Sequence, residues 1–179
     1  MSRNIAVIVG SLRSGSLNRK LASALADMGA GFAAFDILPL GDVPMFNQDL
    51  EDDVPAPVLQ LREKVRAADG VLFVTPEYNR GIPAVLKNAV DWCSRPTGKG
   101  VLAGKAAALA GMSPGAVGTA VAQSQLKPIL VMLGMRLMGQ PELYIQGGAD
   151  YFDAAGRPAD ERSRQFLANF LKRFEAWIG

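Results

Sequence analysis

The stretch Gly10-Ser-Leu-Arg-Ser-Gly-Ser-Leu-Asn18 joins an apolar run, Ile5 to Val9, to a segment with the apolar spacing of a helix. A buried strand that turns through glycine and serine into a helix is a common phosphate-binding layout, because the first N–H groups of a helix are unpaired and carry partial positive charge. Serine hydroxyls and the guanidinium of Arg13 add donors to this turn. The alternative is an ordinary polar turn in which Ser16 caps the helix.

The same turn lacks two common nucleotide-binding fingerprints. It has no G-x-G-x-x-G, the usual dinucleotide pattern, and no G-x-x-x-x-G-K-[ST], the P-loop pattern that places a lysine on the phosphates and a hydroxyl on magnesium. Its donors are hydroxyls, one amide and one arginine. These donors suit a terminal phosphate that is held without a metal ion.

Composition narrows the class of protein further. The 179 residues are 49% hydrophobic and carry a net charge of +2, which suggests one domain over residues 1–179 with a sizeable core. There is no dense basic run, no membrane span and no secretory signal, so we expect a cytoplasmic protein that binds neither nucleic acid nor membrane. The single cysteine, Cys93, excludes an internal disulfide and is expected in the core.

The chain contains no histidine. Serine–histidine and cysteine–histidine nucleophile pairs are therefore excluded, as are metal sites built on histidine. Any catalysis must come from a cofactor or from Asp, Glu, Lys, Arg and Tyr side chains.

Apolar runs and helical patterns alternate along the chain, which is typical of an α/β fold with a doubly wound parallel sheet. Strands are expected at 4–9, 32–38, 71–75 and 105–112, with 136–138 and 142–145 as candidates for the fifth. Helices are expected at 17–28, closed by Gly29, and at 57–68, 84–93, 117–134 and 159–178, with a kink or break at Pro128. We predict five strands in the order 2-1-3-4-5, in a three-layer α/β/α arrangement.

In that order, the loops after strands one, three and four meet at one edge of the sheet, and a ligand is expected between the first two. The second loop, Thr75-Pro-Glu-Tyr-Asn-Arg-Gly-Ile-Pro83, offers acceptor, aromatic and amide groups, and Gly81 would permit close backbone approach or positive φ. Ser113-Pro-Gly115 forms the third loop. We expect the first loop to hold a phosphate and the second a planar ring, an arrangement that suits a flavin.

Other polar and apolar side chains have two interpretations each. Met45 and Phe46, in the long connection 41–55, either pack onto the core or wall a ligand site or subunit contact. Arg80 is either a solvated charge or a contact for the 2′-phosphate of NADPH. Asn88 belongs to a polar helix side that is either solvated or a dimer surface.

The last helix has an apolar side made of Phe166, Leu167, Phe170, Leu171, Phe174 and Trp177.

Three segments, 10–19, 75–92 and 112–119, together resemble the NADPH-dependent FMN reductase family, and the closest resemblance is to bacterial quinone reductases also described as chromate reductases. The resemblance covers nearly the whole chain. It implies a flavodoxin-like fold, tightly bound FMN, and homodimers or homotetramers with the flavin near a subunit interface.

Matched position by position, the resemblance implies three groups of FMN contacts. The phosphate would be held by Ser11, Arg13, Ser16, Leu17 and Asn18. The ring and ribityl chain would contact Pro76, Glu77, Tyr78, Asn79 and Gly81, and the other flavin edge would contact Ser113 and Gly115. No side chain is assigned a catalytic role, although Tyr78 is a candidate gate, and no metal is implied.

The resemblance also implies a ping-pong reaction in which NADPH or NADH reduces the flavin and leaves. A small acceptor, such as a quinone, a free flavin, an azo dye or a metal oxyanion like chromate, would then be reduced at the same place. The alternative is a flavodoxin-type electron carrier that does not oxidise NAD(P)H directly. Such carriers are typically acidic, whereas this chain is slightly basic.

Overall fold

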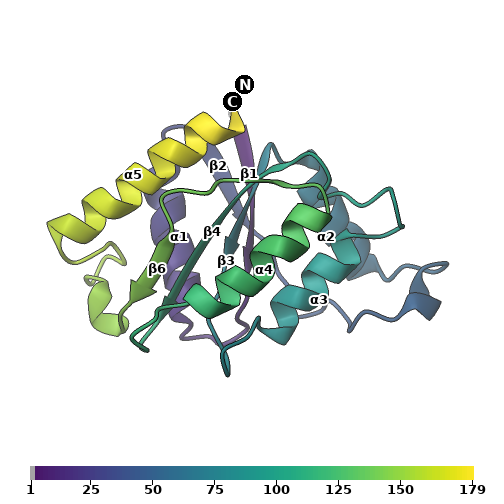
Figure 1. Ribbon diagram of the computed structural model, residues 1–179, viewed down its shortest axis with the longest axis horizontal. Helices are drawn as coiled ribbons and strands as arrows, with labels where there is room; N and C mark the ends of the chain where they lie inside the picture. Colours follow the sequence, from purple (N-terminus) through teal and green to yellow (C-terminus); the bar gives the residue numbers. More distant parts are fainter. Residues whose placement is uncertain (1–2) are drawn as a thin grey trace.

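The computed structural model describes residues 3–179 and places a parallel sheet between two layers of helices (Figure 1). The strands are β1 (Arg3–Val9), β2 (Ala33–Ile37), β3 (Gly70–Val74), β4 (Ala106–Ser113), β5 (Arg136–Leu137) and β6 (Leu143–Gln146). The helices are α1 (Leu17–Gly29), α2 (Ala56–Ala67), α3 (Ala84–Cys93), α4 (Ala120–Met132) and α5 (Glu161–Ile178), with short 3-10 turns η1 (Gln48–Leu50) and η2 (Ala149–Tyr151). Met1 and Ser2, the start of the expected domain, lie outside the described residues.

The strand order β2-β1-β3-β4-β5 confirms the predicted topology, with one correction to the number of strands. β5 pairs with Ala106 and Ala107 at the start of β4, and β6 pairs with residues 110–113 at its end. Both candidate segments are therefore strands, and together they occupy the fifth position of the sheet. The sheet has six strands because the chain leaves the ladder over residues 139–142, after Met138 N donates to the carbonyl of Ala107 (2.8 Å).

Each face of the sheet carries its own hydrophobic cluster, which confirms the three-layer arrangement. α1 and α5 cover one face, where Ile5, Val7 and Val9 of β1 point. α2, α3 and α4 cover the other face, where Ala6 and Ile8 point (Figure 1). Because successive side chains of a strand alternate between faces, a strand buried on both faces needs the continuous apolar run seen in β1.

Two helices differ in detail from expectation: α1 in the reason for its terminal glycine, and α5 in the exposure of two aromatic side chains. Gly29 is the last residue of α1 and has no left-handed φ; a Cβ on it would lie 2.5 Å from the ring of Phe35, so packing is what requires a glycine there. On α5, Leu167, Phe170, Leu171 and Phe174 are buried, but Phe166 and Trp177 are exposed. The helix turns about 100° per residue, so the apolar side chains at the margins of a wide stripe remain outside the core.

α4 continues through Pro128 as one helix, so the expected break into two helices is absent. Leu126 and Leu130, on either side of the proline, are fully buried against the sheet. Packing of both halves onto the same core offsets the backbone hydrogen bond that proline removes.

The long connection 41–55 is anchored to α3 by its polar residues. The carbonyl of Pro44 accepts hydrogen bonds from Asn88 Nδ2 (2.9 Å) and Trp92 Nε1 (2.8 Å), and Phe46 N donates to Asn88 Oδ1 (2.7 Å). The Phe46 ring packs edge-on against Trp92, whereas Met45 is 70% exposed. The expectation of a solvated Asn88 is wrong, because this side chain is only 5% exposed and holds the connection in place.

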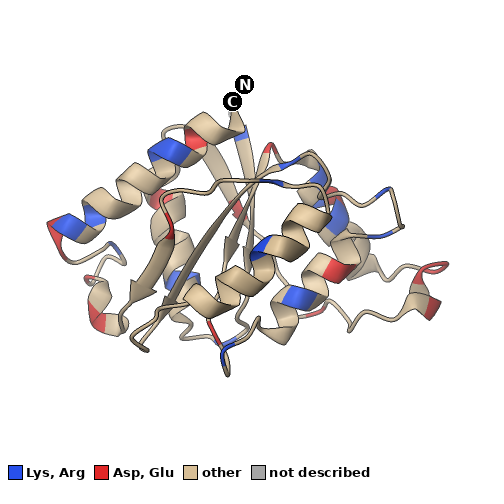
Figure 2. Ribbon diagram, in the orientation of Figure 1, with Lys and Arg blue, Asp and Glu red and all other residues tan. Residues whose placement is uncertain are grey.

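Charged residues of both signs are interspersed along the ribbon (Figure 2). No helix within residues 3–179 combines the length and the apolar character needed to cross a membrane.

A polar network links α4 to β6. Lys127 donates to Glu142 and to the hydroxyl of Tyr144, which itself donates to Glu142 (2.6 Å). The hydrogen bond from Lys127, and then that from Tyr144, lowers the pKa of Glu142. A carboxylate whose pKa is lower in the folded state stabilises the fold above its ordinary pKa, and that contribution is lost as the pH falls through the folded value.

We therefore expect Glu142→Gln to lower the urea midpoint of unfolding at neutral pH but not in acid. The gap between the wild type and the variant should narrow as the pH falls from about 6 to about 3, since protonation removes the charge from Glu142 in the wild type. Urea titrations at several pH values measure this gap. A gap that stays constant over this range would contradict the assigned role of the ionised carboxylate.

Candidate functional site

The loops that follow β1, β3 and β4 line a cleft of about 120 Å³ at the carboxyl edge of the sheet. Its lining residues are Ser11, Arg13, Ser16, Leu17, Asn18, Pro76, Glu77, Tyr78, Met112, Ser113 and Pro114. The three predicted loops thus meet, and most of the predicted residues lie together. Asn79, Gly81 and Gly115 do not line the cleft. Met112 and Pro114 line it without having been predicted, although their position at the end of a strand beside Ser113 was a usable signal.

The start of α1 forms the end of the cleft where the sequence predicts phosphate binding. The Ser16 side chain caps this helix by accepting a hydrogen bond from Arg19 N (3.2 Å), as the capping interpretation expected. The N–H groups of Leu17 and Asn18 still have no carbonyl partner, because they belong to the first turn of the helix. Arg13 is exposed, and no ion pair among residues 3–179 involves it. Capping and anion binding are therefore compatible in this turn.

Asn18 joins the start of α1 to the end of β4. Its Nδ2 donates to the carbonyl of Met112 and its Oδ1 accepts from Met112 N, both at 2.9 Å. The side chain is 3% exposed, and both ends of its amide are engaged by this backbone. The side chain therefore holds two loops of the cleft together, and the backbone N–H of Asn18 remains available to an anion.

Replacing Asn18 by aspartate is expected to destabilise the fold by about 1–3 kcal/mol, because the carboxylate cannot donate to the Met112 carbonyl and leaves it unpaired. Urea unfolding measures this loss. Asn169→Asp, on the exposed side of α5, is the matched control and should change stability by no more than about 0.5 kcal/mol. Equal stability of the two variants would rule out the bridging role.

Glu77 directs its side chain away from solvent and toward α4. Its Oε2 accepts hydrogen bonds from Val121 N (2.9 Å) and Ala122 N (3.0 Å), at the start of α4, and its Oε1 accepts from Arg80 (3.0 Å). The side chain is 5% exposed. The N-cap residue of α4, Thr119, makes no side-chain capping bond, so Glu77 supplies the cap from another loop. The Glu77 side chain therefore positions the second loop.

Residues 78–81 form a two-residue hairpin turn at the mouth of the cleft. Tyr78 and Gly81 exchange backbone hydrogen bonds, and Asn79 and Arg80 both have positive φ (51° and 60°), as in a type I′ turn. The positive φ considered for Gly81 is thus found at the two residues that precede it. Gln125 of α4 donates to the Arg80 carbonyl (2.8 Å) and holds the turn. Tyr78 is 54% exposed and lies at the opening of the cleft.

The third loop is closed by hydrogen bonds to the side chain and the backbone of Ser113. Gly115 N donates to Ser113 Oγ (3.2 Å), and the carbonyl of Ser113 accepts from Gly147 N (3.0 Å). These bonds fix the Ser113 backbone beside the cleft. They leave its hydroxyl hydrogen free to donate to a ligand.

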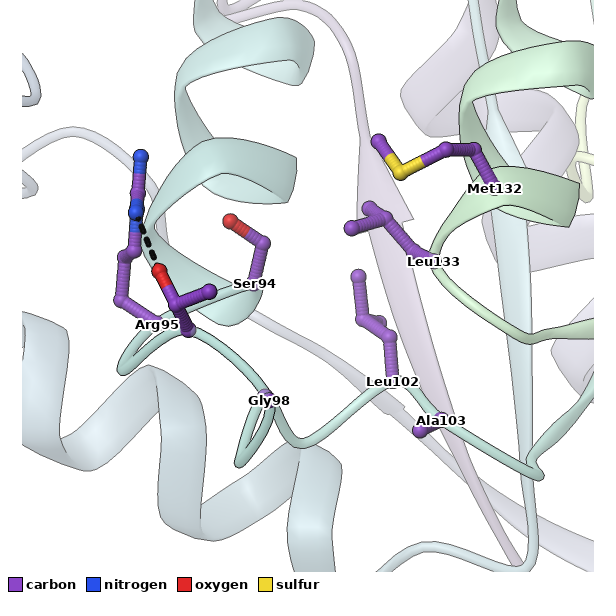
Figure 3. A pocket seen from close by; sticks show the side chains of 9 residues that line it. Ser94, Arg95, Gly98, Leu102, Ala103, Met132 and Leu133 are labelled. Carbon is purple, nitrogen blue, oxygen red and sulfur yellow. Dashed lines mark hydrogen bonds between the residues drawn. The ribbon is translucent and has the colours of Figure 1, made fainter.

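A second, more apolar pocket of about 350 Å³ lies at the opposite edge of the sheet (Figure 3). It is formed by the loop after α3 and the end of α4, and the side chains of Leu102, Met132 and Leu133 point into it. It shares no lining residue with the cleft.

Cys93, at the end of α3, is fully buried, so it is a core residue as expected. Its burial raises the pKa of its thiol to about 12.

The donor set of the cleft suits a phosphorylated ring compound that needs no metal. Unpaired helix N–H groups and one free guanidinium lie at one end, and the turn with Tyr78 lies at the other. Within residues 3–179 there is no group of His, Cys, Asp and Glu side chains that could hold a metal ion.

Comparisons with known proteins agree with this geometry. The family model described as NADPH-dependent FMN reductase matches residues 3–150. A 2-hydroxy-1,4-benzoquinone reductase from a Burkholderia species is 44% identical over 178 residues, which cover 99% of this chain and 97% of the relative. A quinone reductase from Pseudomonas putida is 42% identical over 98% of this chain and 94% of the relative.

Solved structures show the same likeness. FerB, a flavoenzyme NAD(P)H:(acceptor) oxidoreductase from Paracoccus denitrificans, superposes with a TM-score of 0.94 at 44% identity, over 98% of this chain and 97% of that one. A flavodoxin from Streptococcus superposes with a TM-score of 0.61 at 14% identity, which shows the shared fold alone.

Proposed function

Because this chain belongs to the NADPH-dependent FMN reductase family, we propose that it is an FMN-dependent NAD(P)H oxidoreductase whose acceptor is a quinone. The observation that carries the proposal is the cleft at the carboxyl edge of the sheet, where helix N–H groups and Arg13 lie on one side and the turn with Tyr78 on the other. Bound FMN supplies the redox chemistry between NAD(P)H and the acceptor. The chain's own residues bind, orient and shield it.

The roles of the lining residues follow from their placement. Arg13, Ser11 and the N–H groups of Leu17 and Asn18 bind the phosphate. Pro76 and Glu77 form a rigid wall for the ring, because Glu77 is tied to α4. The ring of Tyr78 is half-exposed and lines the cleft, and this supports a role as a gate for nicotinamide and quinone. No proton-transferring side chain is required in this arrangement.

The acceptor range and assembly extend the same proposal. Free flavins, azo dyes and metal oxyanions are further acceptors for an open cleft that two substrates use in turn. We also propose that residues 1–179 form one FMN-binding domain and that it assembles as a homodimer or homotetramer. Light scattering coupled to gel filtration of the FMN-loaded protein measures the assembly, and a monomer would contradict it.

Anaerobic mixing of the FMN-loaded protein with NADPH or NADH tests the function. We expect the flavin absorption band to bleach rapidly and to return when a benzoquinone is added. Values of kcat/KM across quinones, FMN, azo dyes and chromate then rank the acceptors. A flavin that dithionite reduces but neither nucleotide reduces would overturn the enzyme assignment and favour the electron-carrier alternative.

Arg13→Ala is expected to weaken FMN binding about ten- to hundredfold, because a charge-assisted contact to phosphate contributes about 1.5–3 kcal/mol. Quenching of flavin fluorescence during titration of the apoprotein measures the dissociation constant. Arg19→Ala is the matched control, since Arg19 is an exposed neighbour that does not line the cleft. Unchanged FMN affinity in Arg13→Ala would argue against its role.

A further inference from the structure

A groove of about 410 Å³ lies on the outer side of α2, next to the end of α3, and three arginines line it. Arg62 and Arg66 come from α2, and Arg95 follows α3. Figure 2 shows basic segments on α2 and on the loop after α3. The end of α3 lies at the opposite edge of the sheet from the cleft, and the groove shares no lining residue with it. The FMN site does not explain this cluster of cations.

Arg62 is the most unusual member, because it is a cation only 7% exposed that has no carboxylate partner. Its Nε donates to the carbonyl of Trp92 (2.9 Å), and its guanidinium carbon lies 5.7 Å from the centre of the Trp92 ring. None of the ion pairs among residues 3–179 includes Arg62, and its two terminal nitrogens make no hydrogen bond there. A largely buried cation that has no ion-pair partner is costly, and its two terminal nitrogens are free to bind an anion in the groove.

The pKa of Arg62 reflects the same imbalance. Burial is the main cause that lowers it, and the nearby charge of Arg66 lowers it further, against the opposing effects of Cys93 and Glu51. Besides its burial, Arg62 is therefore exposed to the charge of a second guanidinium that lines the same groove.

The neighbouring acids are already engaged or badly placed. Glu63 lines the groove but pairs with Arg66 (2.6 Å). Glu51 Oε1 lies 3.5 Å from Arg95 Nε, and both atoms are buried without a hydrogen bond. Arg95 also donates from Nη1 to Thr97 (2.7 Å), so it is held at the rim of the groove. The groove as a whole keeps a surplus of positive charge.

We propose that this groove is a second anion site, which takes a phosphate group with Arg62 as its buried anchor and Arg66 and Arg95 at its rim. A guanidinium presents a planar fork of N–H donors that matches phosphate oxygens, and several such forks around one groove suit a dianion. The site is separate from the proposed phosphate contact of Arg13 and would remain open when FMN is bound.

Inorganic phosphate is the first probe, and the protein is loaded with FMN so that the cleft is filled. Phosphorus NMR line broadening at constant ionic strength, held with sodium chloride, measures binding. We expect saturable binding that Arg62→Met and Arg66→Gln each weaken about tenfold or more, while Arg162→Gln, at an exposed arginine of α5, leaves it unchanged. Methionine keeps an unbranched side chain against Trp92, and Arg66→Gln at an exposed position tests the site if Arg62→Met fails to fold.

Two results would overturn the proposal: no saturable binding by the wild type, or equal affinity in all the variants. A second titration with 2′-AMP distinguishes the source of the phosphate group. If 2′-AMP binds more tightly than inorganic phosphate, and Arg66→Gln abolishes this binding, the groove is assigned to a nucleoside phosphate. If 2′-AMP binds no more tightly than inorganic phosphate, and the binding of both depends equally on Arg66, the groove is assigned to free phosphate.

Discussion

Gly111→Ala is expected to destabilise the protein by about 3 kcal/mol or more, although it adds one methyl group. Gly111 lies in β4, and a Cβ there would be 2.1 Å from Thr119 Oγ1 and 2.4 Å from the carbonyl oxygen of Thr75. Thr119 is fully buried and accepts a hydrogen bond from Gln123, so it has no room to turn away. The methyl group must therefore displace backbone at the end of β3.

The same displacement should weaken FMN binding, because Thr75 immediately precedes Pro76 of the cleft. Urea unfolding and FMN titration measure the two effects. Gly139→Ala is the matched control: a Cβ there meets nothing within 4 Å, so stability should stay within about 0.5 kcal/mol of the wild type. If Gly111→Ala is as stable to urea as the Gly139→Ala control, β4 is not packed closely against Thr119.

Glu77→Ala should cost about 2–4 kcal/mol of stability and should also weaken FMN binding. The substitution leaves the N–H groups of Val121 and Ala122 without their acceptor at the start of α4, and an unpaired buried donor costs about 1–3 kcal/mol. It also frees the hairpin turn that Arg80 and Glu77 join. The second wall of the cleft would then be held only by Gln125 and by its own backbone bonds.

Two companion variants separate the side-chain contacts of Glu77 from its charge. Glu77→Gln keeps an amide oxygen for the two N–H groups, so it should recover most of the stability but lose the ion pair with Arg80. Glu63→Ala removes an exposed carboxylate that is paired only with Arg66, and it should cost no more than about 1 kcal/mol. Urea unfolding of the three variants in parallel gives the comparison. A Glu77→Ala protein as stable as Glu63→Ala would refute the capping role.

These two residues show how contacts with α4 support the proposed chemistry of the cleft. Gly111 lets α4 approach β4 closely, and Glu77 ties the start of α4 to the second loop. The position of the ring-binding wall therefore depends on the packing of α4. Variants that loosen α4 should raise the FMN dissociation constant even where they touch no lining residue.

The sequence by itself determined the class of fold, the strand order and the three loops that meet at the cleft. Continuous apolar runs such as Ile5 to Val9, and glycine and proline at their ends, are local signals that survive folding unchanged. The motif residues of the first two loops also identified the family, which the family match confirms. The roles of the individual cofactor contacts remain predictions.

Tertiary structure alone decided what several polar side chains do. Asn18 bonds to Met112, 94 positions away, Glu77 caps a helix that starts more than 40 positions later, and Asn88 holds Pro44. Tertiary packing also decided the split of the fifth strand position and the burial of Arg62 without an ion-pair partner. The local periodicity of the sequence indicates which side of a helix or strand is buried. It does not indicate which distant segment supplies a hydrogen-bond partner, because buried polar groups find their partners only when the layers pack together.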